Sequence, residues 1–173
     1  MLEKAANNQT TGKNDGDLAF IWKSIGRIDD CMLVTRDKHA LRSRPMRGLA
    51  RENDNAIWFF TSKSSHKDDE IAVQPEVCLS YCDSASKTYV SLSGRIEITD
   101  DARLIADLWN PGAQAYFPAG PHDPDVALLK FTPASGEYWD APSNPVLLAI
   151  QFIKAKVTGD KLSLGENAKV AMG

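Results

Sequence analysis

Residues 56–67 read AIWFFTSKSSHK, and this stretch decides the fold. The run from Ala56 to Thr61 is aromatic and β-branched, which predicts a strand. The polar residues after it, up to Lys67, predict the start of a helix that Pro75 stops. A strand that leads into an inserted helix, without a regular alternation of strands and helices, favours an antiparallel sheet over a doubly wound parallel one.

The rest of the chain supports this class, with short β-prone runs and a few inserted helices. We expect the other strands at residues 31–35, 41–49, 77–82, 89–98, 126–132 and 137–140. We expect helices at 17–25, 104–109 and 144–156, and a loop through Pro124 where Pro and Gly are dense. Pro45 cannot donate to a strand ladder, so its strand belongs at an edge or a bulge. The sequence therefore predicts an α+β fold built on an antiparallel barrel with peripheral helices.

Length and composition indicate one domain. A chain of 173 residues, 43% of them hydrophobic, can bury about two thirds of its unfolded surface around one core. We expect a flexible leader at residues 1–16, one domain at 17–158 and a tail at 159–173. The three cysteines lack the additional His or Cys partners of a zinc site, so no metal is expected.

Charge and hydropathy restrict the partners. The formal charge of −3, with signs intermixed, leaves no basic face for a nucleic-acid backbone. No apolar run approaches the ~18 residues that a membrane span requires, and the first residues lack the apolar core of a signal peptide. We therefore expect a soluble cytoplasmic protein with neither nucleic acid nor membrane as a partner.

Residues 61–67 also form a candidate anion site. Hydroxyl groups, unpaired backbone N–H groups and two lysines, Lys63 and Lys67, come together at one helix N-terminus, and such termini bind anions. A second interpretation needs no ligand, because Ser65 followed by Asp68 resembles a capping box. Capping explains the serines but not the paired lysines, so phosphate binding and simple capping both stay open.

The preceding strand carries a second candidate surface. Alternation along it places Arg44 and Met46 on one face, and a guanidinium beside a thioether suits a planar ligand with polar edges. A solvated charged face with Met46 at its rim explains the same pattern. Several aromatic residues near loops or strand ends could cover such a ligand or form core and dimer contacts. They are Tyr89, Trp109, Tyr116, Phe117, Tyr138 and Trp139.

Five short motifs, taken in order, resemble one protein family. They are Ser43-Arg44-Pro45-Met46, Ile57-Trp58-Phe59-Phe60-Thr61-Ser62, Ser65-His66-Lys67, Gly120-Pro121-His122-Asp123-Pro124 and Glu137-Tyr138-Trp139-Asp140. The series is similar to the general stress protein branch of the pyridoxamine 5'-phosphate oxidase-like FMN-binding proteins. This resemblance implies a six-stranded split β-barrel that forms a homodimer, with two FMN molecules in clefts between the subunits.

The resemblance also implies residues for the flavin ring. Arg44, Pro45 and Met46 match the strand that lines the ring in the family. Tyr89 falls where the oxidases place a glutamine from the other subunit. Trp139 lies near the position of one of their tryptophans.

For the flavin phosphate, the resemblance implies the junction already described. Phe60 and Thr61 match an aromatic-threonine pair at the ring and the phosphate, and Ser62 follows them. His66 and Lys67 match an Arg-Lys phosphate clamp. His66 departs from that pattern, because an imidazole can be neutral near pH 7 where an arginine stays charged.

These residues predict an FMN-binding protein, with FAD as the alternative flavin. The expected function is a flavin-dependent oxidoreductase of unknown substrate linked to the general stress response. A flavin-binding protein that stores or senses the cofactor is the alternative, as is a binder of pyridoxal phosphate or a deazaflavin on the same scaffold. The Arg-x-His pattern with which the oxidases hold pyridoxine phosphate does not occur after Trp139, so vitamin B6 oxidase activity is not implied.

Overall fold

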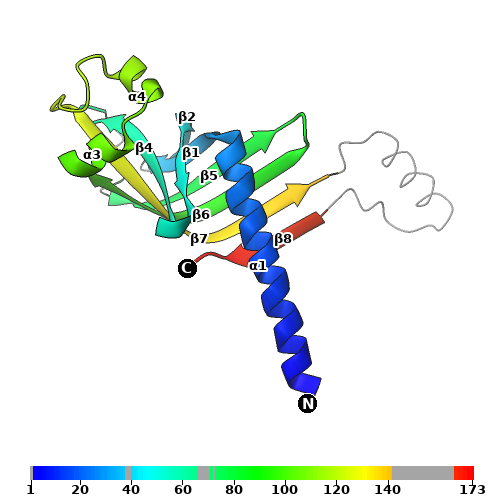
Figure 1. Ribbon diagram of the computed structural model, residues 1–173. Helices are drawn as coiled ribbons and strands as arrows, with labels where there is room; N and C mark the ends of the chain where they lie inside the picture. Colours follow the sequence, from blue (N-terminus) through cyan, green and yellow to red (C-terminus); the bar gives the residue numbers. More distant parts are fainter. Residues whose placement is uncertain (1, 38–39, 66–70, 72, 142–165) are drawn as a thin grey trace.

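One antiparallel sheet organises the molecule, and a long helix crosses it (Figure 1). The structure is a computed structural model that describes residues 2–37, 40–65, 71, 73–141 and 166–173. Its helices are α1 (Leu2–Ile28), α3 (Ala102–Leu108) and α4 (Pro111–Tyr116), with a 3-10 turn at Glu52–Asp54. Its strands are β1 (Asp30–Asp37), β2 (Ala40–Arg47), β3 (Leu49–Arg51), β4 (Ala56–Ser62), β5 (Glu76–Asp83), β6 (Thr88–Thr99), β7 (Val126–Asp140) and β8 (Glu166–Ala171).

The sheet closes on itself at Gly48. The strands follow the order β2-β1-β5-β6-β7-β4-β3, and β8 pairs with β7. Because Gly48 alone separates β2 from β3, the last strand of this row continues into the first. Counted as one bent strand, β2 and β3 complete a six-stranded barrel, to which β8 is an addition. A Cβ atom at position 48 would lie 2.9 Å from Cγ2 of Ile57 and 3.0 Å from Cε1 of Phe59, so a glycine lets the bend approach β4.

The barrel interior is packed by alternate strand residues and by one face of α1. Ile57 and Phe59 of β4 are fully buried in the same hydrophobic cluster as Ile21 and Ile25 of α1. Burying an aliphatic or aromatic side chain of this size contributes about 1.5–3 kcal/mol. The phenol of Tyr138 on β7 donates a hydrogen bond of 2.7 Å to Asp17, which fixes α1 across the sheet.

Several elements differ from the sequence-based expectations. The helix expected at 17–25 begins at Leu2, within the expected flexible leader, and β8 lies within the expected tail. The strands expected at 126–132 and 137–140 are one strand, because a bulge opposite Ser93 and Gly94 accommodates Pro133. The helix expected at 144–156 lies outside the described residues, and the domain boundaries stay predictions.

The expected loop before Pro124 contains a helix. Asn110 caps α4, its Oδ1 accepting a hydrogen bond of 3.0 Å from the Ala113 N–H, and Pro111 occupies the first turn. Asn at the N-cap followed by Pro is a known start signal, which the surrounding Pro and Gly residues obscured. Within the described residues, no helix is both long and apolar enough to cross a membrane.

Candidate functional site

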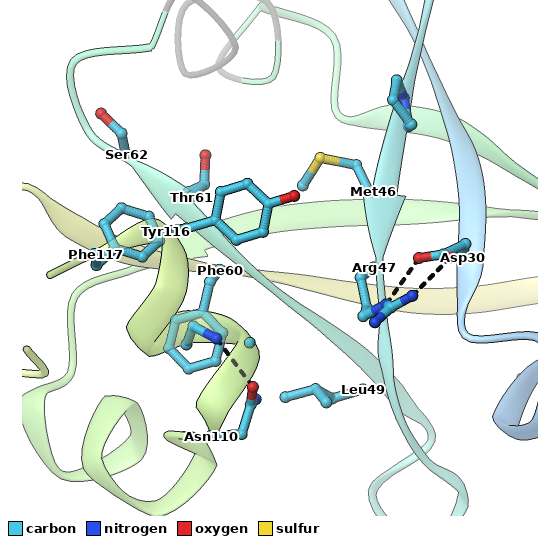
Figure 2. Close-up of a pocket in the computed structure, with 13 residues that line it drawn as sticks. Asp30, Met46, Arg47, Leu49, Phe60, Thr61, Ser62, Asn110, Tyr116 and Phe117 are labelled. Carbon is cyan, nitrogen blue, oxygen red and sulfur yellow. Dashed lines mark hydrogen bonds and ion pairs between the residues drawn. The ribbon is translucent and has the colours of Figure 1, made fainter.

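A cleft lies where β2 and β4 separate. β3 pairs with β4 from Ala56 to Trp58, and beyond Trp58 no strand of the described residues lies against that edge of β4. Among the strands that the structure describes, β2 pairs with β1 alone, which confirms the edge position expected for Pro45. A cavity of about 560 Å³ opens between the two strand edges, beneath α4 (Figure 2). This volume is typical of a small-molecule or cofactor site.

The cleft is lined by the strands on either side of the split and by the segment around α4. The lining residues are Asp30, Pro45, Met46, Arg47, Leu49, Phe60, Thr61, Ser62, Asn110, Gly112, Ala113, Tyr116 and Phe117. Half of the site residues predicted from the sequence are among them: Pro45, Met46, Phe60, Thr61 and Ser62.

Thr61 is the clearest binding feature of the cleft. Its side chain is on the barrel side of β4, and the residue is only 2% exposed. Its Oγ1 is buried and has no hydrogen-bond partner within the described residues. The Oγ of Ser65, just after β4, is also buried and without a partner there. A buried polar group left unpaired costs about 1–3 kcal/mol. Of the two residues, Thr61 lines the cleft, so its hydroxyl is the one available to a ligand there.

The loop after β4 is held by Asp125 at the start of β7. The Ser62 hydroxyl donates to Oδ2 of Asp125 at 2.5 Å, and the Ser64 N–H donates to Oδ1 at 3.0 Å. The hydrogen bond from Ser62, followed by the one from the Ser64 backbone, keeps the pKa of Asp125 below its usual value. Ser62 therefore lines the cleft, but its hydroxyl proton is donated to Asp125 and is not available to a ligand.

Of the two lysines expected at the anion site, the structure describes Lys63 but not Lys67. The Lys63 ammonium pairs with Asp100 at 2.9 Å and is not among the residues that line the cleft. His66 and Lys67 lie outside the described residues. Their assignment to a phosphate clamp stays a prediction.

The wall formed by α4 carries aromatic rings over the cleft. The Trp109 indole meets Phe60 edge to face, with ring centroids 5.4 Å apart, and donates to the Gln114 side chain at 3.1 Å. These contacts fix the segment against β4. Tyr116 is 84% exposed, and its ring extends across the cleft toward Met46 (Figure 2). A planar ligand would therefore find an aromatic face and a thioether together.

An ion pair occupies another part of the lining. Arg47 and Asp30 are cross-strand partners, and the guanidinium donates two hydrogen bonds of 2.8 Å to the carboxylate. Hydrogen bonding from Arg47 lowers the pKa of Asp30. The two charges compensate each other. Sequence reasoning missed this pair, because it depends on the register between β1 and β2.

Three other predicted residues lie away from the cleft lining. Arg44 shares a face of β2 with Met46, as alternation predicts, but does not line the cavity. Tyr89 and Trp139 are cross-strand partners on β6 and β7 and are each 41% exposed. They do not line the cleft within this single chain.

Known proteins resemble the chain over most of its length. Residues 16–163 match the profile of the family described as pyridoxamine 5'-phosphate oxidase like. A crystal structure from Jannaschia sp. CCS1, described as a candidate general stress protein 26, is 32% identical with a TM-score of 0.72, over 90% of this chain and 99% of that one. The general stress FMN/FAD binding protein of Xanthomonas citri is 26% identical with a TM-score of 0.63, over 71% of this chain and 87% of that one.

A curated relative extends the comparison. Protein bli-3 of Neurospora crassa is 24% identical over 151 residues, which cover 81% of this chain and 72% of that protein. Together with the closed six-stranded ring, the solved neighbours confirm the expected split-barrel class.

Proposed function

This chain belongs to the pyridoxamine 5'-phosphate oxidase-like family, and on that premise we propose that its cleft binds FMN. The observation that carries the proposal is the Thr61 hydroxyl, which is buried at the cleft without a partner in the described residues. A buried hydroxyl donor that lacks a partner suits a phosphate group, whose oxygens accept hydrogen bonds. The Xanthomonas citri neighbour, described as an FMN/FAD binding protein, supports the same class of ligand.

The lining fits a flavin in two respects. Met46, Phe60 and Tyr116 provide the apolar and aromatic surface that an isoalloxazine ring requires. The phosphate would lie at the hydroxyl-bearing part of the cleft, near Thr61.

We further propose that the protein is an oxidoreductase of the family's flavin-dependent kind. A bound flavin supplies hydride or electron transfer at its own ring. The chain's residues would bind and orient it, and the α4 wall with Tyr116 would limit the access of water. A storage or sensing role is the second candidate. It is favoured by the Asp30–Arg47 pair, because those two charged lining groups are engaged with each other.

A homodimer is the third part of the proposal. Tyr89 and Trp139 form an exposed aromatic pair on the face of the sheet opposite to α1, with Cys82 beside Tyr89 in the register. Exposed aromatic pairs of this kind are enriched at protein interfaces. The family resemblance assigns the Tyr89 position to a site shared between subunits. The cytoplasmic location stays a prediction.

Purification without added cofactor, followed by a visible spectrum, tests the proposal. Bound oxidised flavin gives a yellow protein, and titration with FMN, FAD and pyridoxal 5'-phosphate ranks the ligands. Anaerobic addition of NADH or NADPH then separates the two roles. Bleaching of the flavin supports the oxidoreductase, whereas tight binding without reduction supports storage or sensing. A protein that binds neither flavin would refute the proposal.

A further inference from the structure

Asp125 lies behind the loop that follows β4 and holds it from three directions. Its two carboxylate oxygens accept the hydrogen bonds from the Ser62 hydroxyl and the Ser64 N–H, at 2.5 and 3.0 Å. Its backbone carbonyl accepts a third, of 2.8 Å, from the Lys63 N–H. Asp125 itself is not among the residues that line the cleft. It therefore acts on the loop and not on a ligand in the cavity.

The contact with Asp125 uses hydrogen-bond donors that a ligand could otherwise engage. A serine hydroxyl has one proton to donate, and that of Ser62 is donated to Asp125. In Figure 2 the Ser62 oxygen points away from Met46 and Tyr116. The Ser64 N–H is shared between Asp125 and the Ser62 oxygen. The hydroxyls of Thr61 and Ser65 are buried and without a partner in the described residues. Of these two, Thr61 lines the cleft, so its hydroxyl is the donor that the contact with Asp125 leaves for a ligand.

A tight turn presents Asp125 to the loop. Gly120, with φ of +90°, adopts a backbone conformation that other residues rarely take, and its carbonyl accepts from the Asp123 N–H at 3.1 Å. The Asp123 carboxylate in turn accepts from the Asp125 N–H at 2.9 Å. The turn is thus fixed internally before it meets the loop. The structural role of the Gly120–Pro124 motif is therefore to hold Asp125 against the loop after β4.

We propose that Asp125 is a positioning residue for the phosphate end of the cleft: it holds the Ser62–Ser65 loop in place beside Thr61, so that the Thr61 hydroxyl, which has no partner within the described residues, faces the phosphate. This inference rests on the proposed flavin binding. Asp125 acts through the loop, so its removal affects recognition of the phosphate while the surface for the ring stays intact.

Two flavins that differ only in the phosphate provide the test. FMN carries it and riboflavin does not, so dissociation constants for both are measured by fluorescence on the full chain. Asp125→Ala removes both carboxylate contacts, and we expect FMN binding to weaken about tenfold with riboflavin binding unchanged. Asp125→Asn keeps an acceptor for the Ser64 N–H and a donor for the Ser62 oxygen. It should bind FMN within about threefold of wild type.

Other outcomes overturn the inference. Tighter FMN binding by both variants would mean that the Asp125 charge only repels the phosphate. A parallel loss of FMN and riboflavin, together with a lower unfolding temperature, would mean a general structural role. Wild type that binds FMN, with an Asp125→Ala variant that binds it equally, would refute the positioning role alone. Wild type that binds neither flavin would refute the proposed function and, with it, this inference.

A matched control and a second variant complete the design. Asp100 is an exposed carboxylate that pairs with Lys63 of the same loop, so Asp100→Asn removes a negative charge nearby without touching the Asp125 contacts. The ratio of FMN to riboflavin affinity should stay at the wild-type value. If Asp125→Ala does not fold, Ser62→Ala tests the same contact from the loop side and should also weaken FMN selectively. An unchanged ratio in Ser62→Ala would count against the positioning role.

Discussion

Replacing Thr61 by valine should raise the stability of the ligand-free protein. Valine has nearly the shape of threonine and suits a strand, but it lacks the hydroxyl. Because Oγ1 of Thr61 is buried without a partner in the described residues, its removal relieves an unpaired polar group. Taking the lower end of the usual 1–3 kcal/mol, we expect a gain of about 1 kcal/mol, or roughly 2–4 °C in the unfolding midpoint.

The same substitution should weaken FMN binding. Loss of one hydrogen bond to a charged phosphate costs about 1.5 kcal/mol, which is roughly a tenfold rise in dissociation constant. Ligand binding adds to the free energy of unfolding by mass action. A tenfold weaker affinity means that saturating FMN stabilises the variant by about 1.4 kcal/mol less than it stabilises wild type. The order of stability then reverses, with wild type ahead by about 0.4 kcal/mol.

Thermal unfolding with increasing FMN measures both effects in one series. Thr88→Val is the matched control, because Thr88 is also 2% exposed but donates a hydrogen bond of 2.9 Å to Asp140. The control should lose about 1–3 kcal/mol of stability and bind FMN as wild type does. A Thr61→Val protein that is less stable than wild type without ligand, and equally responsive to FMN, would contradict the role given to this hydroxyl.

The remaining predictions concern the clamp, the interface and one ion pair. Lys67→Ala should weaken FMN binding by ~1.5–3 kcal/mol in a titration, whereas Lys63→Ala should change it little, since the Lys63 ammonium pairs with Asp100. Trp139→Lys should shift the flavin-saturated protein toward the monomer in sedimentation at micromolar concentration, and an unchanged dimer would place the interface elsewhere. Asp30→Asn should lower the unfolding midpoint slightly at neutral pH. Because the pKa of Asp30 is lowered in the folded protein, its contribution is present above its ordinary value of 3.8 and is lost as the pH falls through the folded-state pKa. The two unfolding curves should therefore converge in acid, and a constant difference down to the lowest pH would refute this assignment.

Local patterns predicted the strands and the residues that strands carry into the cleft. Met46 and Thr61 were identifiable because alternation and the strand-to-helix junction are short-range signals. Phe60 was assigned through the family resemblance. Thr61 could be assigned to the proposed anion site, although the three-dimensional structure is needed to show that its hydroxyl has no partner among the described residues.

The missed features depend on distant parts of the chain. Asp125 meets Ser62 only because β4 pairs with β7, and Arg47 meets Asp30 only through the register of β1 and β2. The α4 wall had a local signal at Asn110, which a high content of Pro and Gly outweighed. The periodicity of a single sequence does not reveal which distant strands pair with each other.

The bend at Gly48 bears on how the barrel folds. Neighbouring strands such as β1 and β2 form hairpins with little loss of chain entropy, whereas β4 must find β7, with Phe60 opposite Leu128. Met46 and Thr61, on the two sides of the split, come together only when this ring is complete. We therefore expect the flavin site to form late, so that FMN slows the unfolding rate strongly while leaving the refolding rate almost unchanged in stopped-flow measurements.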